Sequence, residues 1–282
     1  MTDMRRLFFI CIAAIVPLLA GCSSVGYYLQ SIEGQVRLLW ARQPIADVIA
    51  DPATPLPLKA RLERVLAIRD FASRELRLPD NPSYRSYVDL QRPFVVWNVF
   101  AAAEFSVEPR EVCFLIVGCV SYRGYFAQAE GEAYARELRS EGLDVFVSGV
   151  PAYSTLGWFD DPVLNTFINY LDYALSRLIF HELAHQIVYV KGDTEFNESF
   201  AAAVETEGVR RWIARSGDDR MRDDFERSQQ RRTQFRALLF EYRERLAALY
   251  RLPIAPDEMR VRKAQTFSDM RRDYGLLKSQ WG

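Results

Sequence analysis

The sequence predicts a mainly helical α+β fold with a small mixed β-sheet, and three observations indicate it. Residues 25–78 and the second half of the chain repeat apolar residues every three to four positions, as amphipathic helices do. Residues 94–100 and 112–117 are rich in β-branched and aromatic residues, which is typical of strands. Between them and a third strand-like run lies a helical stretch, and this strand–helix–strand order favours a mixed sheet.

The elements follow in order along the chain. Residues 58–68 carry the clearest helical repeat of the N-terminal part, and prolines and polar residues at 79–82 break it. A helix is predicted over residues 127–141, followed by a strand over 144–150. Residues 151–162 contain glycine, proline and aspartate, which predicts a loop or an edge strand.

The second half of the chain is predicted to be helical. A helix is expected from 163 to about 189, with Asp161 as its N-cap and Pro162 at its first position. Gly192 ends that helix, and another runs from 194 to about 215. Beyond Gly217 the chain is highly charged to about residue 252, which predicts a solvated pair of helices.

The first 21 residues are typical of a secretion signal. Arg5 and Arg6 precede an apolar run over residues 7–20, which is too short for a comfortable membrane span. The run ends in Leu-Ala-Gly-Cys, which resembles the cleavage box of bacterial lipoproteins. The resemblance implies that residues 1–21 are removed and Cys22 carries lipid, at the periplasmic face of the outer membrane because Ser23 is not aspartate. An ordinary signal peptide or an uncleaved anchor helix is the alternative.

Composition sets the remaining limits. The chain has 282 residues, 36 basic and 37 acidic, and 49% of its residues are hydrophobic, which is globular rather than disordered. We expect residues 22–282 to form a single domain. A net charge of −1 gives no support for a nucleic-acid partner.

Two cysteines remain in the mature chain, Cys113 and Cys119. An oxidising periplasm permits a disulfide between them. A straight strand would separate them by about 20 Å, so a bridge requires a turn, which Gly118 could supply. Two buried thiols are the alternative.

The two histidines of the chain, His181 and His185, lie in one H-E-x-x-H pentapeptide. On a helix, residues four apart share a face about 6 Å apart at Cβ, so two imidazoles can bind one metal ion. Glu182 between them can act as a base. Catalytic zinc takes three protein ligands and leaves one position for water. Because the chain has no third histidine, the third ligand should be a carboxylate, or the metal is not zinc.

The next predicted helix offers that carboxylate. Glu198 and Glu205 are seven positions apart and share a helix face, with small alanines between them. Alanines allow two helices to approach closely, which would bring Glu198 against the histidines.

Residues 181–186 together with 197–201 resemble the gluzincin metallopeptidases, and the zinc aminopeptidases in particular. The separation of His185 and Glu198 is shorter than in the best-known gluzincins. A closer resemblance is to a family of bacterial lipoproteins described as predicted aminopeptidases, carried by residues 113–126, 149–162 and 193–198. Members of that family continue beyond the equivalent of Trp281, which allows for a missing C-terminal piece.

The resemblance implies a zinc-dependent peptide hydrolase, with His181, His185 and Glu198 as zinc ligands. Zinc would activate a water molecule, and Glu182 would take its proton and pass it to the leaving amine. Glu195 or Glu205 could pair with a free α-amine of the substrate.

Other roles are also predicted around this centre. Asp193 and Glu205 are candidate partners for the imidazole N–H groups, and Tyr153 and Tyr189 are candidate oxyanion donors. Residues 152–159 lie where gluzincins place an edge strand that binds the substrate backbone.

Two other functions are consistent with the sequence, a non-enzymatic zinc-binding envelope scaffold and a specific endopeptidase. The intact Glu182 argues against the scaffold, because a structural zinc site has no use for a base and favours four protein ligands. Dependence of cleavage on a free amine would separate the two peptidases.

Overall fold

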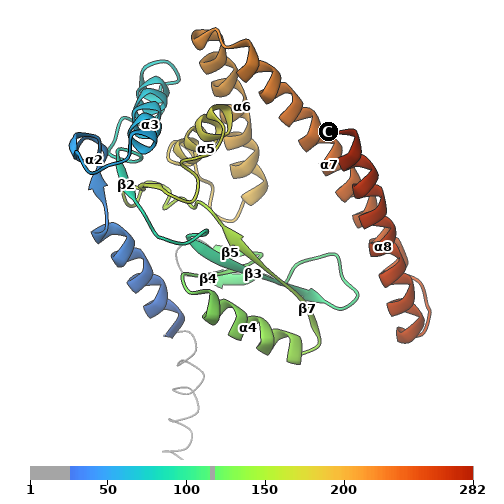
Figure 1. The fold of residues 1–282 in the computed structure, drawn as a ribbon. Helices are drawn as coiled ribbons and strands as arrows, with labels where there is room; N and C mark the ends of the chain where they lie inside the picture. The colour runs from blue at the N-terminus through green and yellow to red at the C-terminus, as the bar shows by residue number, and fades with distance from the viewer. Residues whose placement is uncertain (1–25, 115–117, 282) are drawn as a thin grey trace, which may run out of the picture.

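The computed structural model describes residues 26–114 and 118–281, and the fold is mainly helical with a small β-sheet portion (Figure 1). The described helices are residues 26–40, α2 (Ile45–Ala50), α3 (Leu56–Arg74), α4 (Gln128–Ser140), α5 (Asp172–His185), α6 (Thr194–Ser216), α7 (Asp219–Tyr250) and α8 (Pro256–Gln280). The described strands are β1 (Gln43–Pro44), β2 (Ser86–Val88), β3 (Val96–Ala103), β4 (Val112–Phe114), β5 (Gly118–Val120), β6 (Arg123–Tyr125), β7 (Leu143–Val150) and β8 (Val163–Leu164).

The main sheet is antiparallel in the order β6-β3-β7. Strands β3 and β7 pair along eight residues, from Val96 opposite Val150 to Ala103 opposite Leu143, so β7 is an edge strand of this sheet. Helix α4 packs on one face, where Val99 and Tyr125 join Ala135 and Leu138 in a small core. In Figure 1, α4 lies below the sheet, and α5 and α6 lie above it.

A second sheet, β1-β2-β8, contains the mixed pairing. Strand β2 is antiparallel to β1 and parallel to β8, with Tyr87 opposite Val163. The prediction of a mixed sheet is therefore confirmed, but the mixed pairing lies in strands of two or three residues. Segments this short carry no periodicity that could predict them.

The largest core lies between the second sheet and helices α3, α5 and α6. Helix α3 buries Leu62, Val65 and Ile68 on one face, and α5 buries Leu175 and Ile179 against them. Each such side chain contributes roughly 1.5–3 kcal/mol when it is fully removed from water. This core packs against the face of α5 that carries no candidate metal ligand. The face that carries His181 and His185 is therefore turned toward α6.

Helices α5 and α6 approach closely at Gly208. A Cβ atom at this position would lie 2.8 Å from the Phe180 ring and 2.8 Å from Leu76, so only glycine fits without a shift. Ala201, one of the alanines predicted to allow close packing, is fully buried.

The predicted helix from 163 to 189 is wrong at both ends, because α5 spans only Asp172–His185. Val163 and Leu164 are buried in β8, where they pair with β2. Asp161 is not an N-cap. Its buried carboxylate accepts hydrogen bonds from the backbone N–H of Thr155 at 2.9 Å and from its hydroxyl at 2.8 Å. Apolar residues such as Val163 and Leu164 are compatible with a helix or a strand, and their pairing with β2 favours the strand.

The charged region after Gly217 is also different from the predicted pair within 217–252. Gly217 ends α6 in the left-handed conformation, with φ of 65°, and Asp218 caps α7 by accepting from Met221 N–H. Helix α7 then runs unbroken to Tyr250 and pairs with α8. Ion pairs such as Arg245–Glu241 satisfy its exposed charges.

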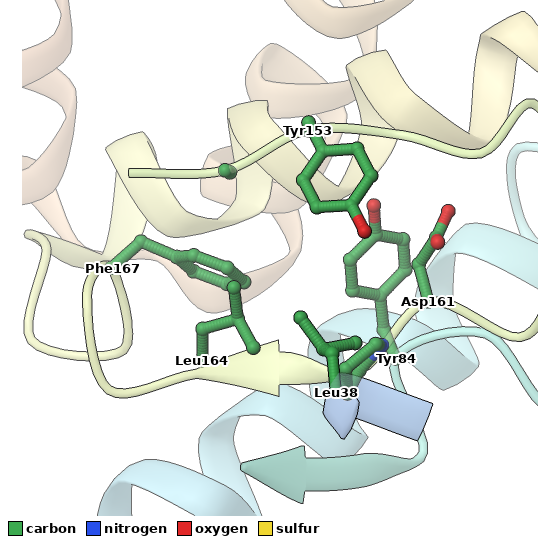
Figure 2. A pocket seen from close by; sticks show the side chains of 8 residues that line it. Leu38, Tyr84, Tyr153, Asp161, Leu164 and Phe167 are labelled. Atoms are coloured by element: carbon green, nitrogen blue, oxygen red, sulfur yellow. The ribbon is translucent and has the colours of Figure 1, made fainter. Parts of the chain in front are cut away.

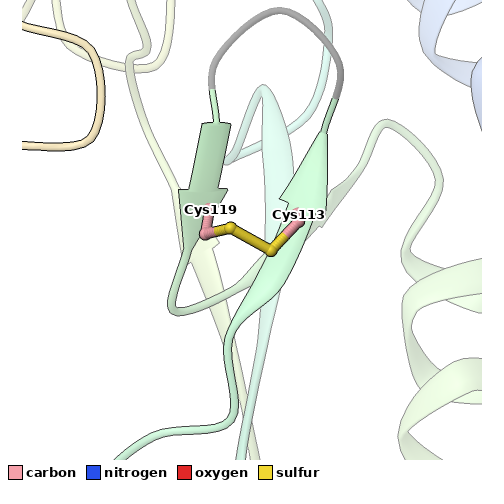
Figure 3. Close-up of a disulfide and its surroundings, with 2 residues drawn as sticks. All are labelled: Cys113 and Cys119. Atoms are coloured by element: carbon pink, nitrogen blue, oxygen red, sulfur yellow. A yellow bond between two sulfur atoms is a disulfide. The ribbon is translucent and has the colours of Figure 1, made fainter.

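Strands β4 and β5 form a hairpin in which Cys113 lies opposite Cys119, and a disulfide joins the two (Figure 3). Of the two alternatives for these cysteines, the structure therefore has the bridge. The signal segment and Cys22 lie outside the described residues. Among the helices of the described ranges, none combines the length and the apolar character needed to cross a membrane.

Candidate metal centre

His181 and His185 lie one turn apart near the C-terminal end of α5. Their ring centroids are 4.7 Å apart, and the two Nε2 atoms are 3.1 Å apart. His185 is buried, whereas the His181 side chain is 20% exposed, so the pair faces a partly open space. The spacing of the motif thus brings two nitrogen ligand atoms to one point.

Glu198 reaches the same point from the first turns of α6. Its Oε2 lies 3.3 Å from His181 Nε2, and its Oε1 lies 3.6 Å from His185 Nε2. One ligand atom from each of these three residues falls within 4.8 Å of the others. This group could therefore bind a metal ion.

Asn197 explains why Glu198 is held there. Its side chain accepts a hydrogen bond from Val190 N–H at 2.8 Å and donates one to the Val190 carbonyl at 2.8 Å. Asn197 is 2% exposed, so its end of this two-way link is buried. It fixes the first turn of α6 against the segment that leaves α5, and so places Glu198 beside the histidines.

Glu205 contacts the His181 ring at its other nitrogen, on the side away from Glu198. Its Oε2 accepts a hydrogen bond from His181 Nδ1 at 2.9 Å. With Nδ1 bound to Glu205, Nε2 is the ring nitrogen that faces Glu198. A carboxylate that binds the outer nitrogen of a ligating histidine fixes both its tautomer and its ring orientation.

Two arginines hold the Glu205 carboxylate in turn. Arg232 of α7 donates to Oε1 at 3.1 Å, and Arg177 of α5 lies 3.9 Å from the same oxygen. Burial raises the pKa of Glu205, but His181 and the two arginines outweigh burial and keep it below its ordinary value. Sequence reasoning missed both arginines. Arg177 precedes His181 by four positions and was detectable by helix spacing, whereas nothing in the sequence links Arg232 to the site.

The residues fit a bound cation. Two imidazole nitrogens and a carboxylate oxygen converge toward one point, and this set of ligand types is the one that catalytic zinc uses. Burial lowers the pKa of His181, but hydrogen bonds to Glu198 and Glu205 outweigh it and raise the pKa to about 10. The carboxylates thus favour positive charge at this point.

Glu182 lies beside the ligands on α5 and is partly buried. Burial raises its pKa to about 7, with the nearby charges of Asp161 and Glu198 adding to the effect and His181 opposing it. A carboxylate with a pKa near neutrality can both accept and return a proton at physiological pH.

Residues 151–162 form a loop beside Glu182, which is one of the two alternatives predicted for this segment, and the edge strand is β7 just before it. Asp161 holds the loop through its hydrogen bonds to Thr155. In such loops, aspartate and threonine side chains bind the backbone groups that a strand would pair with its neighbour in a sheet. The Ser154 hydroxyl donates a hydrogen bond to Asp161 Oδ2 at 3.4 Å.

The Tyr153 hydroxyl has another partner, which argues against its predicted role as an oxyanion donor. Its hydroxyl donates to the Gln35 side chain, and with Tyr84 and Asp161 it lines a cavity of about 10 Å³ (Figure 2). This is room for about one water molecule. Tyr84, which the sequence did not single out, is buried with φ of 62°, and burial together with Glu182 and Asp161 raises its pKa well above 10.

Two predicted candidates remain, Asp193 and Tyr189. Asp193 caps α6 by accepting from Phe196 N–H at 2.9 Å, and Tyr189 is 40% exposed. The Tyr122 ring packs against Phe100. Burial, together with the charge of Glu198, raises the pKa of Tyr122.

Comparison with known proteins gives one match. A family model described as "Putative aminopeptidase" matches residues 26–282. Neither the curated proteins nor the solved structures contain a match to the chain.

Proposed function

Because the chain belongs to the family described as "Putative aminopeptidase", which indicates a peptide hydrolase, we propose that it is a zinc-dependent aminopeptidase anchored at the bacterial cell envelope. The observation that supports the zinc dependence is the convergence of His181, His185 and Glu198 within 4.8 Å. The buried Glu205 behind His181 adds to it, because carboxylates commonly orient the histidines of zinc sites.

Glu182 is proposed as the general base and acid. Zinc, when bound, would supply a Lewis acid that activates water and polarises the peptide carbonyl. Glu182 would take a proton from the attacking water and return it to the leaving amine, a role that suits a pKa of about 7. The place of Glu182 on α5, next to His181 and partly buried, would keep its carboxylate close to the reacting atoms.

The free α-amine of the substrate requires a carboxylate. Glu205 already binds His181 and Arg232, which makes it a poor partner for an amine. Glu195 lies exposed in the first turn of α6, three positions before Glu198. We therefore assign the amine-binding role to Glu195.

The anchoring part of the proposal depends on Cys22. The lipoprotein-like segment ahead of it would be cleaved, and lipid on Cys22 would hold the enzyme at the periplasmic face of the membrane. Peptides and the membrane are the proposed partners, and nucleic acid is not among them.

Metal analysis and digestion of a peptide library test the function. We expect about one zinc ion per chain, since the centre has one set of three ligands, and cleavage of peptides with a free N-terminus. Glu182→Gln should keep the zinc and lose the cleavage. Cleavage that survives this change would remove Glu182 from the mechanism, and equal inactivity of both proteins would favour a scaffold. Cleavage of N-acetylated peptides at the same rate would favour an endopeptidase.

A further inference from the structure

The first described helix, residues 26–40, is fixed to the body of the protein by one face. The Gln30 side chain accepts a hydrogen bond from Phe126 N–H at 3.2 Å and donates one to the Gly124 carbonyl at 3.4 Å. Gly34 lies so close to the Phe126 ring that a Cβ atom would be 2.2 Å from it, and Leu38 is 4% exposed. Figure 1 shows this helix (blue) at the margin of the molecule.

The opposite face of the helix is apolar and exposed. Four side chains spaced three or four positions apart form what we call the N-terminal stripe: Leu29, Ile32, Val36 and Trp40, which are 61%, 60%, 36% and 85% exposed. This spacing places all four on one side of the helix. Single exposed apolar residues are ordinary, but a continuous row opposite a docked face indicates an interaction surface.

The stripe has the composition of a surface that meets lipid. A tryptophan lies at one end, and tryptophan prefers the boundary between headgroups and acyl chains. The Glu33–Arg37 ion pair, at 2.6 Å, lies beside the stripe and gives it a charged border. A helix with one apolar face and one polar border lies in the plane of the interface, with its apolar side buried among the lipids.

The position of the stripe in the chain favours the membrane over other occupants. The helix is described from Gly26, only four positions after Cys22, and the apolar run of residues 7–20 lies just ahead of that cysteine. Lipid on Cys22 would therefore hold the start of the stripe within a few residues of the bilayer surface.

We propose that the N-terminal stripe lies in the interfacial region of the bilayer, so that the helix rests flat on the membrane beside the lipid anchor. This inference rests on the proposed anchoring at Cys22. Because Gln30, Gly34 and Leu38 fix the helix to the body, the contact also sets the orientation of the whole enzyme. The lipid then acts as a tether and the stripe as a second, rigid contact.

Fluorescence quenching tests the proposal on the mature, lipidated chain in phosphatidylethanolamine–phosphatidylglycerol vesicles. Lipids brominated on their acyl chains quench nearby tryptophan, and the contribution of Trp40 is obtained by difference from Trp40→Phe. We expect at least about a twofold loss of Trp40 emission, since interfacial helices bury their apolar face ~5–10 Å deep. Trp158, 72% exposed and outside the stripe, gives the matched comparison through Trp158→Phe and should lose nothing.

A second pair of variants separates the stripe from a general effect of exposed apolar residues. Leu29→Asp should abolish the quenching of Trp40, whereas Leu56→Asp, at an 80% exposed leucine of α3, should leave it unchanged. Equal Trp40 emission in brominated and ordinary lipid overturns the proposal. A dimer in detergent that Leu29→Asp dissociates, without quenching, would assign the stripe to a second copy instead. The mass of lipidated Cys22 and the zinc content are measured separately, so failure of the anchor or of the metal site is distinguishable.

Discussion

Glu205 accepts a hydrogen bond from His181 Nδ1 at 2.9 Å, and this bond decides which nitrogen of His181 faces Glu198. The two residues belong to different helices, α5 and α6. The geometry of the metal centre thus depends on the packing of that helix pair as much as on the histidine motif.

Glu205→Gln should weaken zinc binding. The amide keeps the shape of the side chain but loses the charge that orients and polarises His181. Losing such a partner typically costs about 10–100-fold in metal affinity. Competition with a chromophoric chelator measures this affinity. Glu207→Gln, an exposed glutamate two positions along α6, is the control and should bind zinc as the wild type does.

Arg232→Met tests the arginine that α7 contributes. The change leaves the 5% exposed Glu205 carboxylate with one fewer positive partner. Because the Arg232 side chain is 42% exposed and partly screened, we expect a modest loss of about 1 kcal/mol in the free energy of unfolding. Zinc affinity should fall in the same variant, as chelator competition would show. Arg236→Met, one turn further along α7, should change neither quantity, and equal effects from both arginines would contradict the assignment.

Gly208→Ala should destabilise the protein by roughly 1–3 kcal/mol, because the new methyl group would overlap Phe180 and Leu76. Urea denaturation measures the change. Gly275→Ala, in α8, is the matched control, since a Cβ there meets nothing within 4 Å. In that open position alanine should stabilise the helix by about 0.5–1 kcal/mol. A Gly208→Ala protein as stable as the control would show that α5 and α6 are not in such close contact.

The stability of the protein should depend on the ionisation of Asp161. Burial raises its pKa to about 6 from 3.8, while hydrogen bonds from Thr155 and Ser154 oppose the rise. The folded state therefore favours the neutral carboxyl, and this contribution is present below pH 3.8 and is lost as pH rises through about 6. The difference amounts to about 3 kcal/mol.

Asp161→Asn removes the titration and isolates this effect. The difference in unfolding free energy between wild type and variant should move in favour of the variant between pH 4 and pH 7. Urea denaturation at both pH values measures it. A difference that is independent of pH would mean that Asp161 titrates normally.

The elements with strong local signals were predictable. The helix near 127–141 and the strand near 144–150 match α4 and β7 within one residue, because alternating and helical patterns there agree with the tertiary structure. Strand β8 was not predictable, since two residues pair with β2 only after the chain has folded. The length of α5 was overestimated for the same reason.

The candidate metal centre was likewise predictable only in part. The convergence of His181, His185 and Glu198 follows from spacing on two helices, which the sequence displays. Arg232 lies 27 residues after Glu205 on a different helix, and no pattern in the sequence relates the two. Asn197 was visible only as part of a family motif, and its physical role as a buried link to Val190 required the structure.

The link between Asn197 and Val190 uses main-chain atoms of the connecting segment, not its side chains. Apart from Gly192, which has φ of 82°, and Asp193, which caps α6, residues of that connection can therefore be exchanged widely, provided that their number stays the same. One inserted or deleted residue before Val190 would shift the anchoring carbonyl and rotate Glu198 out of reach. Over evolution, this turn should vary in composition while its length stays constant.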